Sequence, residues 1–321
     1  MAVIGVDLGG TKISSALLSG ADQITCHHKT YLNKAKGDEV GELIKTRIQF
    51  LLAEAEKTGE TVTSVGVSVP GIYYTTTGNV WAPNIPGWDN YPLLKKLQES
   101  FPAIHFYITN DRACYILGEV WKGKAKGCKD VIYIAVGTGL AAGIMINGEV
   151  LYGSDGIAGA IGWLALNRPF EEKYIPVGCN EYYASGEGIA RYAREVIAAK
   201  PDYKGVFKSG KEPNSLNIIE EFDKDEEIAV AVMNNAIAYW GMSVANLVSI
   251  FNPEKIIFGG GVFSNNGFRF LDAIYAEALK WGQPISMKQV ELACSENGEM
   301  SGLFGAIYHA IESETRKQRH G

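Results

Sequence analysis

The sequence lacks several signatures that would assign it to a class at once. It contains no CxxC pair, and its five cysteines are an odd number spread over the whole length. Neither a disulfide scaffold nor a cysteine-based zinc site is therefore indicated. No run of eighteen apolar residues is present, so we expect no membrane-spanning helix. A strand is predicted within two residues of Met1, which leaves no room for a cationic leader or a DNA-binding domain before it. We expect a cytoplasmic protein with reduced thiols.

Basic charge is also scarce. The net charge of −6 argues against a nucleic-acid partner, because binding to a phosphate backbone needs a basic surface. A hydrophobic content of 46% with 21% charged residues is typical of a globular protein, and 321 residues predict two domains. Neither a Walker A motif nor a GxGxxG is present, so the P-loop and Rossmann folds lack their fingerprints.

What the sequence does contain is a glycine turn at the end of an apolar strand. An apolar run from Val3 leads into Asp7, and the turn Gly9-Gly10-Thr11-Lys12 follows before a second apolar run. Glycines let the main chain approach an anion closely, and such a turn exposes backbone N–H groups. A phosphate could therefore bind at this turn, and Asp7 could hold Mg²⁺ against it. The alternative is an ordinary hairpin with a glycine-rich bend.

The opening pattern occurs twice. A predicted strand over Val131–Val136 leads into the turn Gly137-Thr138-Gly139, and a second strand follows over Leu140–Ile146. A third turn, Gly259-Gly260-Gly261, follows the apolar segment 255–258. Each half also continues with alternating strands and helices, with helices predicted over about 93–101, 180–200 and 226–251. This alternation predicts an α/β fold with mixed sheets, in which two similar halves form a ligand cleft at their junction.

A carboxylate follows one of the predicted strands. Asn110 and Asp111 come directly after the strand at 105–109 and before a helical run at 113–121. Asp111 could act as a general base and take the proton of a substrate hydroxyl in phosphoryl transfer. The alternative is that Asp111 is the N-cap of the helix. The loops at Pro70-Gly71 and Ala82–Trp88 suit sugar recognition, although ordinary surface loops have the same composition.

Together these motifs resemble the ROK family of sugar kinases within the actin-like ATPase superfamily, over nearly the whole chain. The motifs that carry the resemblance are DLGGTK at Asp7–Lys12, VPG at Val69–Gly71, PNIPGW at Pro83–Trp88, Asn110-Asp111, the turn at Val136–Gly139 and the turn at Gly259–Gly261. The resemblance implies two ribonuclease H-like lobes with a cleft between them. The implied division is 1–115 for the N-terminal lobe, 116–301 for the C-terminal lobe and 302–321 for a terminal helix that packs back on the first lobe. It also implies a homodimer.

By this resemblance the protein transfers the γ-phosphoryl group of ATP to a hexose hydroxyl, the one on C6 being the first candidate. The turns Gly9–Lys12 and Gly137–Gly139 would bind phosphates, Gly259–Gly261 would lie on the adenosine side, and Mg²⁺ would sit near Asp7. Asp111 would be the catalytic base. The residues implied on the sugar side are Gly71, Asn84, Asn110, Asp111 and Glu181. Glu181 could instead be a first-turn glutamate that the helix dipole favours.

The chain also departs from the family pattern. Where the family carries GExGH, this sequence reads Gly159-Ala160-Ile161-Gly162-Trp163, so Ala160 replaces the glutamate and Trp163 the histidine. Of the family's CxCGxxGCxE run, only Cys179 and the glutamate at 181 remain. One thiol without the histidine cannot build a four-ligand zinc site, so we expect no zinc. Trp163 could stack on a sugar or fill the core of its lobe.

Two functions remain open at this point. The first is a sugar kinase for glucose or for a substituted sugar such as an N-acetylhexosamine, because an apolar Ala160 and Trp163 could accept a substituent. The second is a binding protein that senses sugar or nucleotide without turnover. The presence of Asp7, Asp111 and both phosphate turns favours catalysis, since a binding module has no need of a base.

Overall fold

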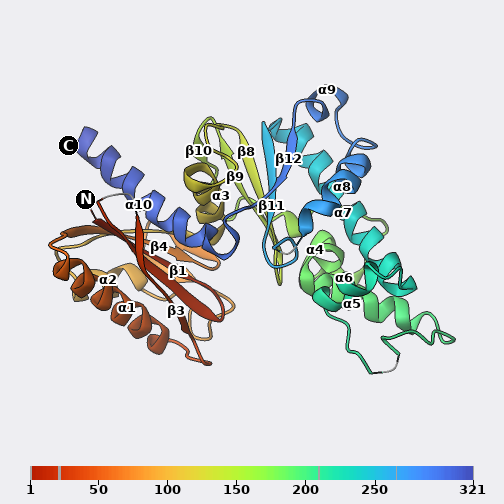
Figure 1. Ribbon diagram of the computed structural model, residues 1–321, viewed down its shortest axis with the longest axis horizontal. Coiled ribbons are helices and arrows are strands. Elements are labelled where there is room, and N and C mark those ends of the chain that lie inside the picture. Colours follow the sequence, from red (N-terminus) through yellow and green to blue (C-terminus); the bar gives the residue numbers. More distant parts are fainter. Residues whose placement is uncertain (1, 21–22, 209, 265, 321) are drawn as a thin grey trace. The chain divides into compact units, whose positions relative to one another are not determined.

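Each half of the chain builds a five-stranded sheet, and the two sheets have the same strand order (Figure 1). The computed structural model describes residues 2–20, 23–208, 210–264 and 266–320. Two compact units are present. Unit 1 is formed by Met1–Lys126, Tyr152–Ala158 and Glu299–Gly321, and unit 2 by Gly127–Leu151 and Gly159–Gly298. Residues 116–126 thus lie in unit 1, and the short segment 152–158 also belongs to it.

The sheet of unit 1 has the order β3-β2-β1-β4-β7. Its strands are β1 (Ala2–Leu8), β2 (Lys12–Leu18), β3 (Ile24–Tyr31), β4 (Val62–Val69) and β7 (His105–Asn110). β1, β2 and β3 are antiparallel neighbours, whereas β4 and β7 run parallel to β1. β5 (Ile72–Tyr74) and β6 (Asn79–Trp81) form a separate two-stranded antiparallel sheet.

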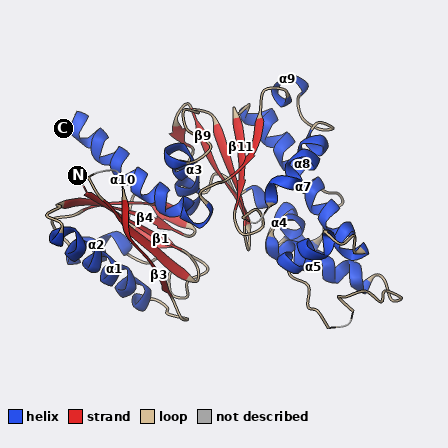
Figure 2. Cartoon of the chain, viewed as in Figure 1, coloured by secondary structure: helices blue, strands red, loops and turns tan. Residues whose placement is uncertain are grey.

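The sheet of unit 2 repeats this plan with the order β10-β9-β8-β11-β12. Its strands are β8 (Val131–Val136), β9 (Leu140–Ile146), β10 (Glu149–Val150), β11 (Lys255–Gly259) and β12 (Glu291–Cys294). β8, β9 and β10 are antiparallel neighbours, and β11 and β12 run parallel to β8. The mixed α/β fold predicted from the alternation of strands and helices is confirmed (Figure 2).

Helices cover both faces of the sheet in unit 1. They are α1 (Asp38–Lys57), α2 (Leu93–Ser100), α3 (Asp111–Lys122) and α10 (Ser301–His320). α10, from the far end of the sequence, packs against α3, β1 and β4. β1 and β4 are almost continuously buried, as expected of strands covered on both faces. Gly66 on β4 allows the close approach of α10, because a Cβ there would lie 1.8 Å from the backbone oxygen of Ala306.

The remaining helices belong to unit 2. They are α4 (Cys179–Ala184), α5 (Gly186–Ala198), α6 (Ser215–Phe222), α7 (Glu227–Phe251), α8 (Leu271–Ala278) and α9 (Pro284–Met287), with short 3₁₀ turns at Ile161–Trp163, Glu172–Tyr174 and Gly267–Phe270. A fourth 3₁₀ turn, Gly298–Met300, precedes α10. α7 is long and apolar enough to cross a membrane by length and composition, but it is mostly buried in the core of unit 2.

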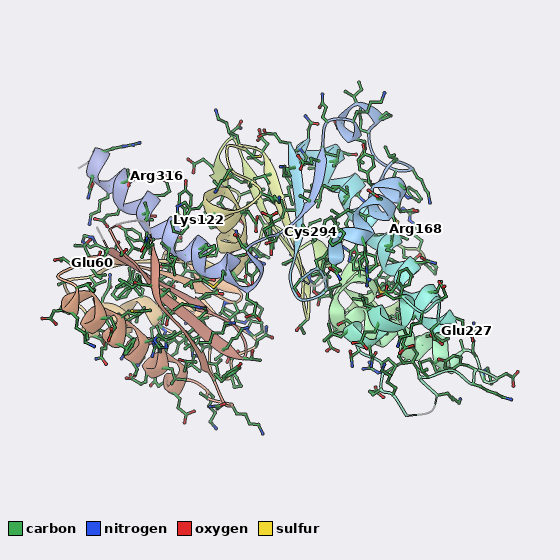
Figure 3. The ribbon with its side chains drawn as sticks, in the orientation of Figure 1. Glu60, Lys122, Arg168, Glu227, Cys294 and Arg316 are labelled. Carbon is green, nitrogen blue, oxygen red and sulfur yellow. The ribbon has the colours of Figure 1, made fainter. Side chains whose placement is uncertain are left out.

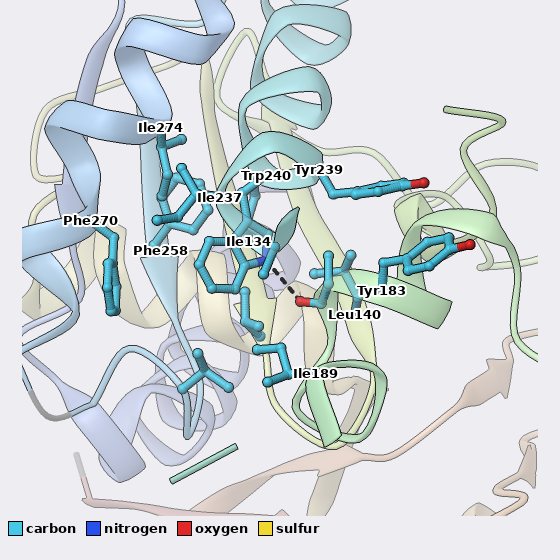
Figure 4. Close-up of a cluster of buried hydrophobic side chains, with 14 of the residues drawn as sticks. Ile134, Leu140, Tyr183, Ile189, Ile237, Tyr239, Trp240, Phe258, Phe270 and Ile274 are labelled. Atoms are coloured by element: carbon cyan, nitrogen blue, oxygen red, sulfur yellow. Dashed lines mark hydrogen bonds between the residues drawn. The ribbon is translucent and has the colours of Figure 1, made fainter. Parts of the chain in front are cut away.

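That core is shown in Figure 4, where Trp240 of α7 packs among Phe258, Phe270 and Ile274. The indole Nε1–H of Trp240 donates to the backbone oxygen of Ala184 at 2.8 Å, which ties α7 to the end of α4. The prediction of a single helix over about 180–200 is wrong, because this segment forms two helices, α4 and α5. The helix breaks at Ser185, whose side chain caps α5 by accepting the N–H of Gly188 at 2.9 Å.

Candidate active site

The first glycine turn joins β1 to β2 in unit 1. The N–H of Gly9 donates to the backbone oxygen of Lys12 at 2.9 Å and closes the turn. Gly10 lies against the loop that carries Asn84, because a Cβ at Gly10 would be 3.3 Å from the Cβ of Asn84. Thr11 accepts a backbone bond from Leu32 at 2.9 Å. Unit 1 therefore brings the predicted phosphate turn and the predicted sugar-side Asn84 together.

Asp7 stands at the end of β1 and is enclosed by its own unit. It is paired across the sheet with Ser14 on β2 and with Ser68 on β4. Gly302 in the first turn of α10 lies against it, since a Cβ there would be 2.5 Å from Oδ2 of Asp7. Burial raises the pKa of the Asp7 carboxyl from 3.8 to about 6; the Ser68 hydroxyl opposes this shift and the charge of Asp111 adds to it. Two carboxylates thus share one desolvated region, where a cation is favourable.

Asp111 is the first residue of α3, and it is not the cap of that helix. The N-cap is Asn110, whose Oδ1 accepts the N–H of Ala113 at 2.9 Å. The capping alternative for Asp111 is therefore wrong, and its carboxylate accepts the neighbouring N–H of Arg112 at 2.9 Å. Burial raises the pKa of Asp111, while the Arg112 charge opposes the shift.

Arg112 is a residue that the sequence did not reveal. Its guanidinium donates to the backbone oxygens of Gly71 at 3.2 Å and Gly156 at 2.8 Å. Gly71 has a φ of +104°, and a Cβ there would lie 2.2 Å from the backbone oxygen of Trp81. Arg112 therefore fixes the Pro70-Gly71 loop next to Asn110 and Asp111. No local sequence signal predicts these bonds, because their partners are about forty residues away on either side.

Lys12 at the first turn is already paired. Its Nζ lies 2.8 Å from Oε1 of Glu299, and Lys29 lies 2.5 Å from the other carboxylate oxygen. The hydrogen bonds and charges of the two lysines lower the pKa of Glu299 to about 2. Glu299 precedes α10 and is far from Lys12 in sequence, so the motif alone gave no sign of it. At the phosphate turn, Lys12 would have to share its charge between Glu299 and a ligand.

The second glycine turn, in unit 2, is held by α4 and α5. The N–H of Gly137 donates to the backbone oxygen of Gly139 at 3.0 Å, and the N–H of Gly186 donates to the oxygen of Gly137 at 2.8 Å. A carboxylate oxygen of Glu181 accepts the N–H of Leu140 at 2.8 Å, directly after the turn. Burial raises the pKa of Glu181. Glu181 is thus more than a residue favoured by the helix dipole, because it fixes the turn itself.

The third glycine turn continues β11 and meets the end of β8. Gly259 lies against the ring of Tyr133, because a Cβ there would be 1.8 Å from the hydroxyl oxygen. Gly260 has a φ of +87° and lies on the backbone of Val136. A Cβ added at Gly261 would meet no atom within 4 Å. Since Val136 precedes Gly137, unit 2 brings its two predicted nucleotide turns side by side.

The model of the ROK family matches residues 3–313. The chain belongs to the ROK family. A curated glucokinase of Halalkalibacterium halodurans is 32% identical over 98% of this chain and 97% of its own length. A xylose repressor of Caldicellulosiruptor bescii is 28% identical over 87% of this chain and 69% of its own length. The crystal structure of a ROK family glucokinase from Streptomyces griseus, in complex with glucose and AMPPNP, is 27% identical with a TM-score of 0.75, covering 97% of this chain and all of that one.

The segment around Cys179 lacks most of the zinc run that the resemblance implied. Cys179 is buried in the hydrophobic core of unit 2. No group of three or more His, Cys, Asp or Glu residues that could hold a metal occurs in the described ranges. The donors around Cys179 therefore do not fit a zinc ion. Trp163 does not fill the core, because 59% of its surface is exposed. That alternative is wrong.

Proposed function

We propose that this ROK protein is a kinase that transfers the γ-phosphoryl group of ATP to a hydroxyl of a sugar. The proposal rests on the Asp111 carboxylate, which burial desolvates and which does not cap α3. Because Asn110 caps α3 in its place, the carboxylate is left for chemistry, and burial moves its pKa toward neutrality. A base works best when its pKa approaches the operating pH.

The transfer would then proceed as follows. Asp111 takes the proton of the sugar hydroxyl as its oxygen attacks the γ-phosphorus, and the bond from that phosphorus to the β–γ bridging oxygen breaks, leaving ADP. The backbone N–H groups of the glycine turns would orient the phosphates, since phosphoryl transfer depends mostly on positioning and charge stabilisation. Asn110, Asn84 and Gly71 would orient the sugar, and Glu181 is proposed as a further sugar contact.

Mg²⁺ fits the residues at the end of β1. A single carboxylate together with substrate phosphates and water is a usual Mg²⁺ site, and the desolvated Asp7 carboxylate, with its raised pKa, offers that donor. When bound, the cation would neutralise charge on the phosphates. Asp7 would hold it, and Ser68 would orient the Asp7 carboxylate.

A second candidate is a sugar-responsive binding protein, which the similarity to a xylose repressor favours. ADP release measured with MgATP over a panel of hexoses, N-acetylhexosamines and xylose separates the two. Release that depends on sugar, and that disappears in Asp111→Asn, supports the kinase. Sugar binding seen by calorimetry with no ADP release for any sugar would contradict it and support the binding protein.

A further inference from the structure

Arg112 links three segments of unit 1 that are far apart in the sequence. It follows Asp111 in the first turn of α3, and Nη2 of its guanidinium donates to the backbone oxygens of both Gly71 and Gly156. Gly71 lies in the loop after β4, whereas Gly156 lies in the segment Tyr152–Ala158. In the sequence this segment comes between two stretches of unit 2, yet its contacts place it in unit 1. Arg112 therefore fastens it to the start of α3.

Two further hydrogen bonds hold the same segment. Nδ2 of Asn110 donates to the Gly156 oxygen at 3.4 Å, and the Thr109 hydroxyl donates to the Tyr152 hydroxyl at 3.3 Å. Both are longer than the 2.8 Å bond from Arg112. Hydrogen bonds from a charged donor are also stronger than those between neutral groups. We therefore take the bond from Arg112 to be the strongest of the three.

The segment forms one wall of a polar hollow beside Asn110. The hollow has a volume of about 330 Å³, and the residues that line it all belong to unit 1. Its lining includes Tyr73, Thr109, Asn110, Tyr152, Asp155 and Gly156. Small-molecule sites typically measure roughly 300–1,000 Å³. Since Asn110 and Gly156 both line the hollow, the bond from Arg112 to Gly156 helps to set its width beside the residue proposed to orient the sugar.

The charge of Arg112 also acts on the proposed base. Burial raises the pKa of Asp111, and the guanidinium charge opposes that rise. From β1 the Asp7 carboxyl shares this region and its charge interacts with that of Asp111. The Cys114 thiol on α3 is kept neutral because burial raises its pKa, and α10 presents the uncharged Gly302 against Asp7. Loss of the Arg112 charge would therefore raise the pKa of Asp111 further.

The Arg112 side chain is not fully satisfied by these contacts. Its Nε–H is buried and has no hydrogen-bond partner among the described residues. A buried donor without a partner destabilises the fold, and an ordinary apolar side chain would avoid that penalty. Stability alone therefore does not account for an arginine at this position.

We propose that Arg112 is a positioning residue for the phosphoryl transfer, which holds the Gly71 loop and the Tyr152–Ala158 segment against Asn110 and Asp111. The inference rests on the proposed function and adds a residue to it. Arg112 acts through the two backbone oxygens and through the neighbouring base. A lysine would keep the charge, but its flexible ammonium lacks the fixed planar donors of a guanidinium. Substitution can therefore separate the charge from the two backbone bonds.

The test measures kcat and KM from pH 5 to 9 in Arg112→Gln and Arg112→Lys, with MgATP and glucose, or with the fastest sugar of the panel. In Arg112→Gln we expect the KM for sugar to rise about tenfold or more, while the KM for ATP stays within twofold. The acid limb of kcat should move to higher pH, because the base must be deprotonated to act and its pKa rises. Arg112→Lys should leave that limb in place and raise the KM for sugar by a smaller factor.

Lys122→Gln is the matched control, because it removes a positive charge from the last turn of the same helix; Lys122 is labelled in Figure 3. Its two KM values and its acid limb should equal those of the wild type. A KM for sugar within twofold of wild type in Arg112→Gln would overturn the proposal. So would an unmoved acid limb, or an equal rise in both KM values, because a purely structural role gives those results.

Thermal unfolding shows whether each variant folds. If Arg112→Gln does not, Arg112→Lys decides: a raised KM for sugar with an unchanged KM for ATP supports the proposal, and any other pattern overturns it. Phosphorylation of no sugar by the wild type would instead contradict the proposed function. Calorimetry with glucose then tests Arg112: weaker binding in Arg112→Gln but not in Lys122→Gln supports its role in holding the sugar-side segments, and equal binding overturns it.

Discussion

Gly302 in α10 lies directly against the carboxylate of Asp7 at the end of β1. A Cβ at Gly302 would be 2.5 Å from Oδ2 and 2.6 Å from Cγ of Asp7. The first turn of α10 therefore packs directly against the carboxylate at the end of β1. This contact joins residues 295 positions apart (302 − 7), and it explains why a glycine stands in the first turn of a helix, where glycine is otherwise unfavourable.

Gly302→Ala tests this contact. In an ordinary helix position the change would stabilise the protein by about 1 kcal/mol. Here we expect a lower thermal midpoint and at least a tenfold loss of kcat, because Asp7 must move or α10 must shift. Thermal unfolding and steady-state kinetics measure the two effects. A variant that is both more stable and fully active would show that a Cβ at position 302 fits beside Asp7 without displacing it.

Asp111→Asn should reduce kcat by about 10²–10⁴-fold, the usual contribution of a general base. Nucleotide and sugar affinity should stay close to wild type, because the shape is retained and Asn110 still caps α3. The thermal midpoint near neutral pH should not fall, since the change removes a carboxylate whose ionised form burial disfavours. Steady-state kinetics gives kcat, calorimetry gives the two affinities, and thermal unfolding gives the midpoint. Near-normal kcat with the best sugar would refute the proposed role.

Asp7→Asn tests the raised pKa of Asp7. The folded protein holds this proton up to about pH 6, whereas the unfolded chain releases it near 3.8. The unfolded state therefore binds fewer protons between these values, and stability contributed by this group falls as pH rises from about 4 to 6. Asp7→Asn should remove this fall, raise the thermal midpoint at pH 7 and abolish turnover.

The control for that profile is Asp89→Asn, an exposed carboxylate in the same unit. Midpoints are compared from pH 4 to 7, and the control should follow the wild type throughout. If Asp7→Asn follows it as well, desolvation at Asp7 is smaller than its surroundings indicate.

The sequence predicted the strands and glycine turns well because both are local features. Apolar runs bounded by glycines indicate β1, β8 and β11 without any tertiary information. Arg112 and Glu299 could not be found in this way, since their roles depend on partners distant in sequence. The break between α4 and α5 had a local signal, Ser185 followed by Gly186, but the apolar periodicity on either side concealed it. At Asn110-Asp111 both residues are good caps, and only the folded backbone distinguishes them.

The purified protein should contain no stoichiometric zinc, and a chelator should leave its thermal midpoint unchanged. Cys179 lies in the hydrophobic core of unit 2 and belongs to no group of metal donors among the described residues, and a structural zinc needs four ligands. Elemental analysis beside thermal unfolding measures both. About one zinc per chain would mean that ligands outside the expected segment bind it.

Glu181 offers a way to separate its two roles, because its carboxylate both accepts the Leu140 N–H and is proposed to orient the sugar. In Glu181→Gln the amide oxygen can still accept that N–H, so the Gly137–Gly139 turn should keep its form. We expect the KM for sugar to rise about tenfold or more, as for loss of a charged hydrogen-bond partner, while the KM for ATP stays within twofold. Glu181→Ala removes both bonds and leaves the Leu140 N–H unsatisfied, so the KM for ATP should rise too and the thermal midpoint should fall. A KM for sugar close to wild type in Glu181→Gln, with both KM values raised in Glu181→Ala, would show that Glu181 acts only by holding the turn.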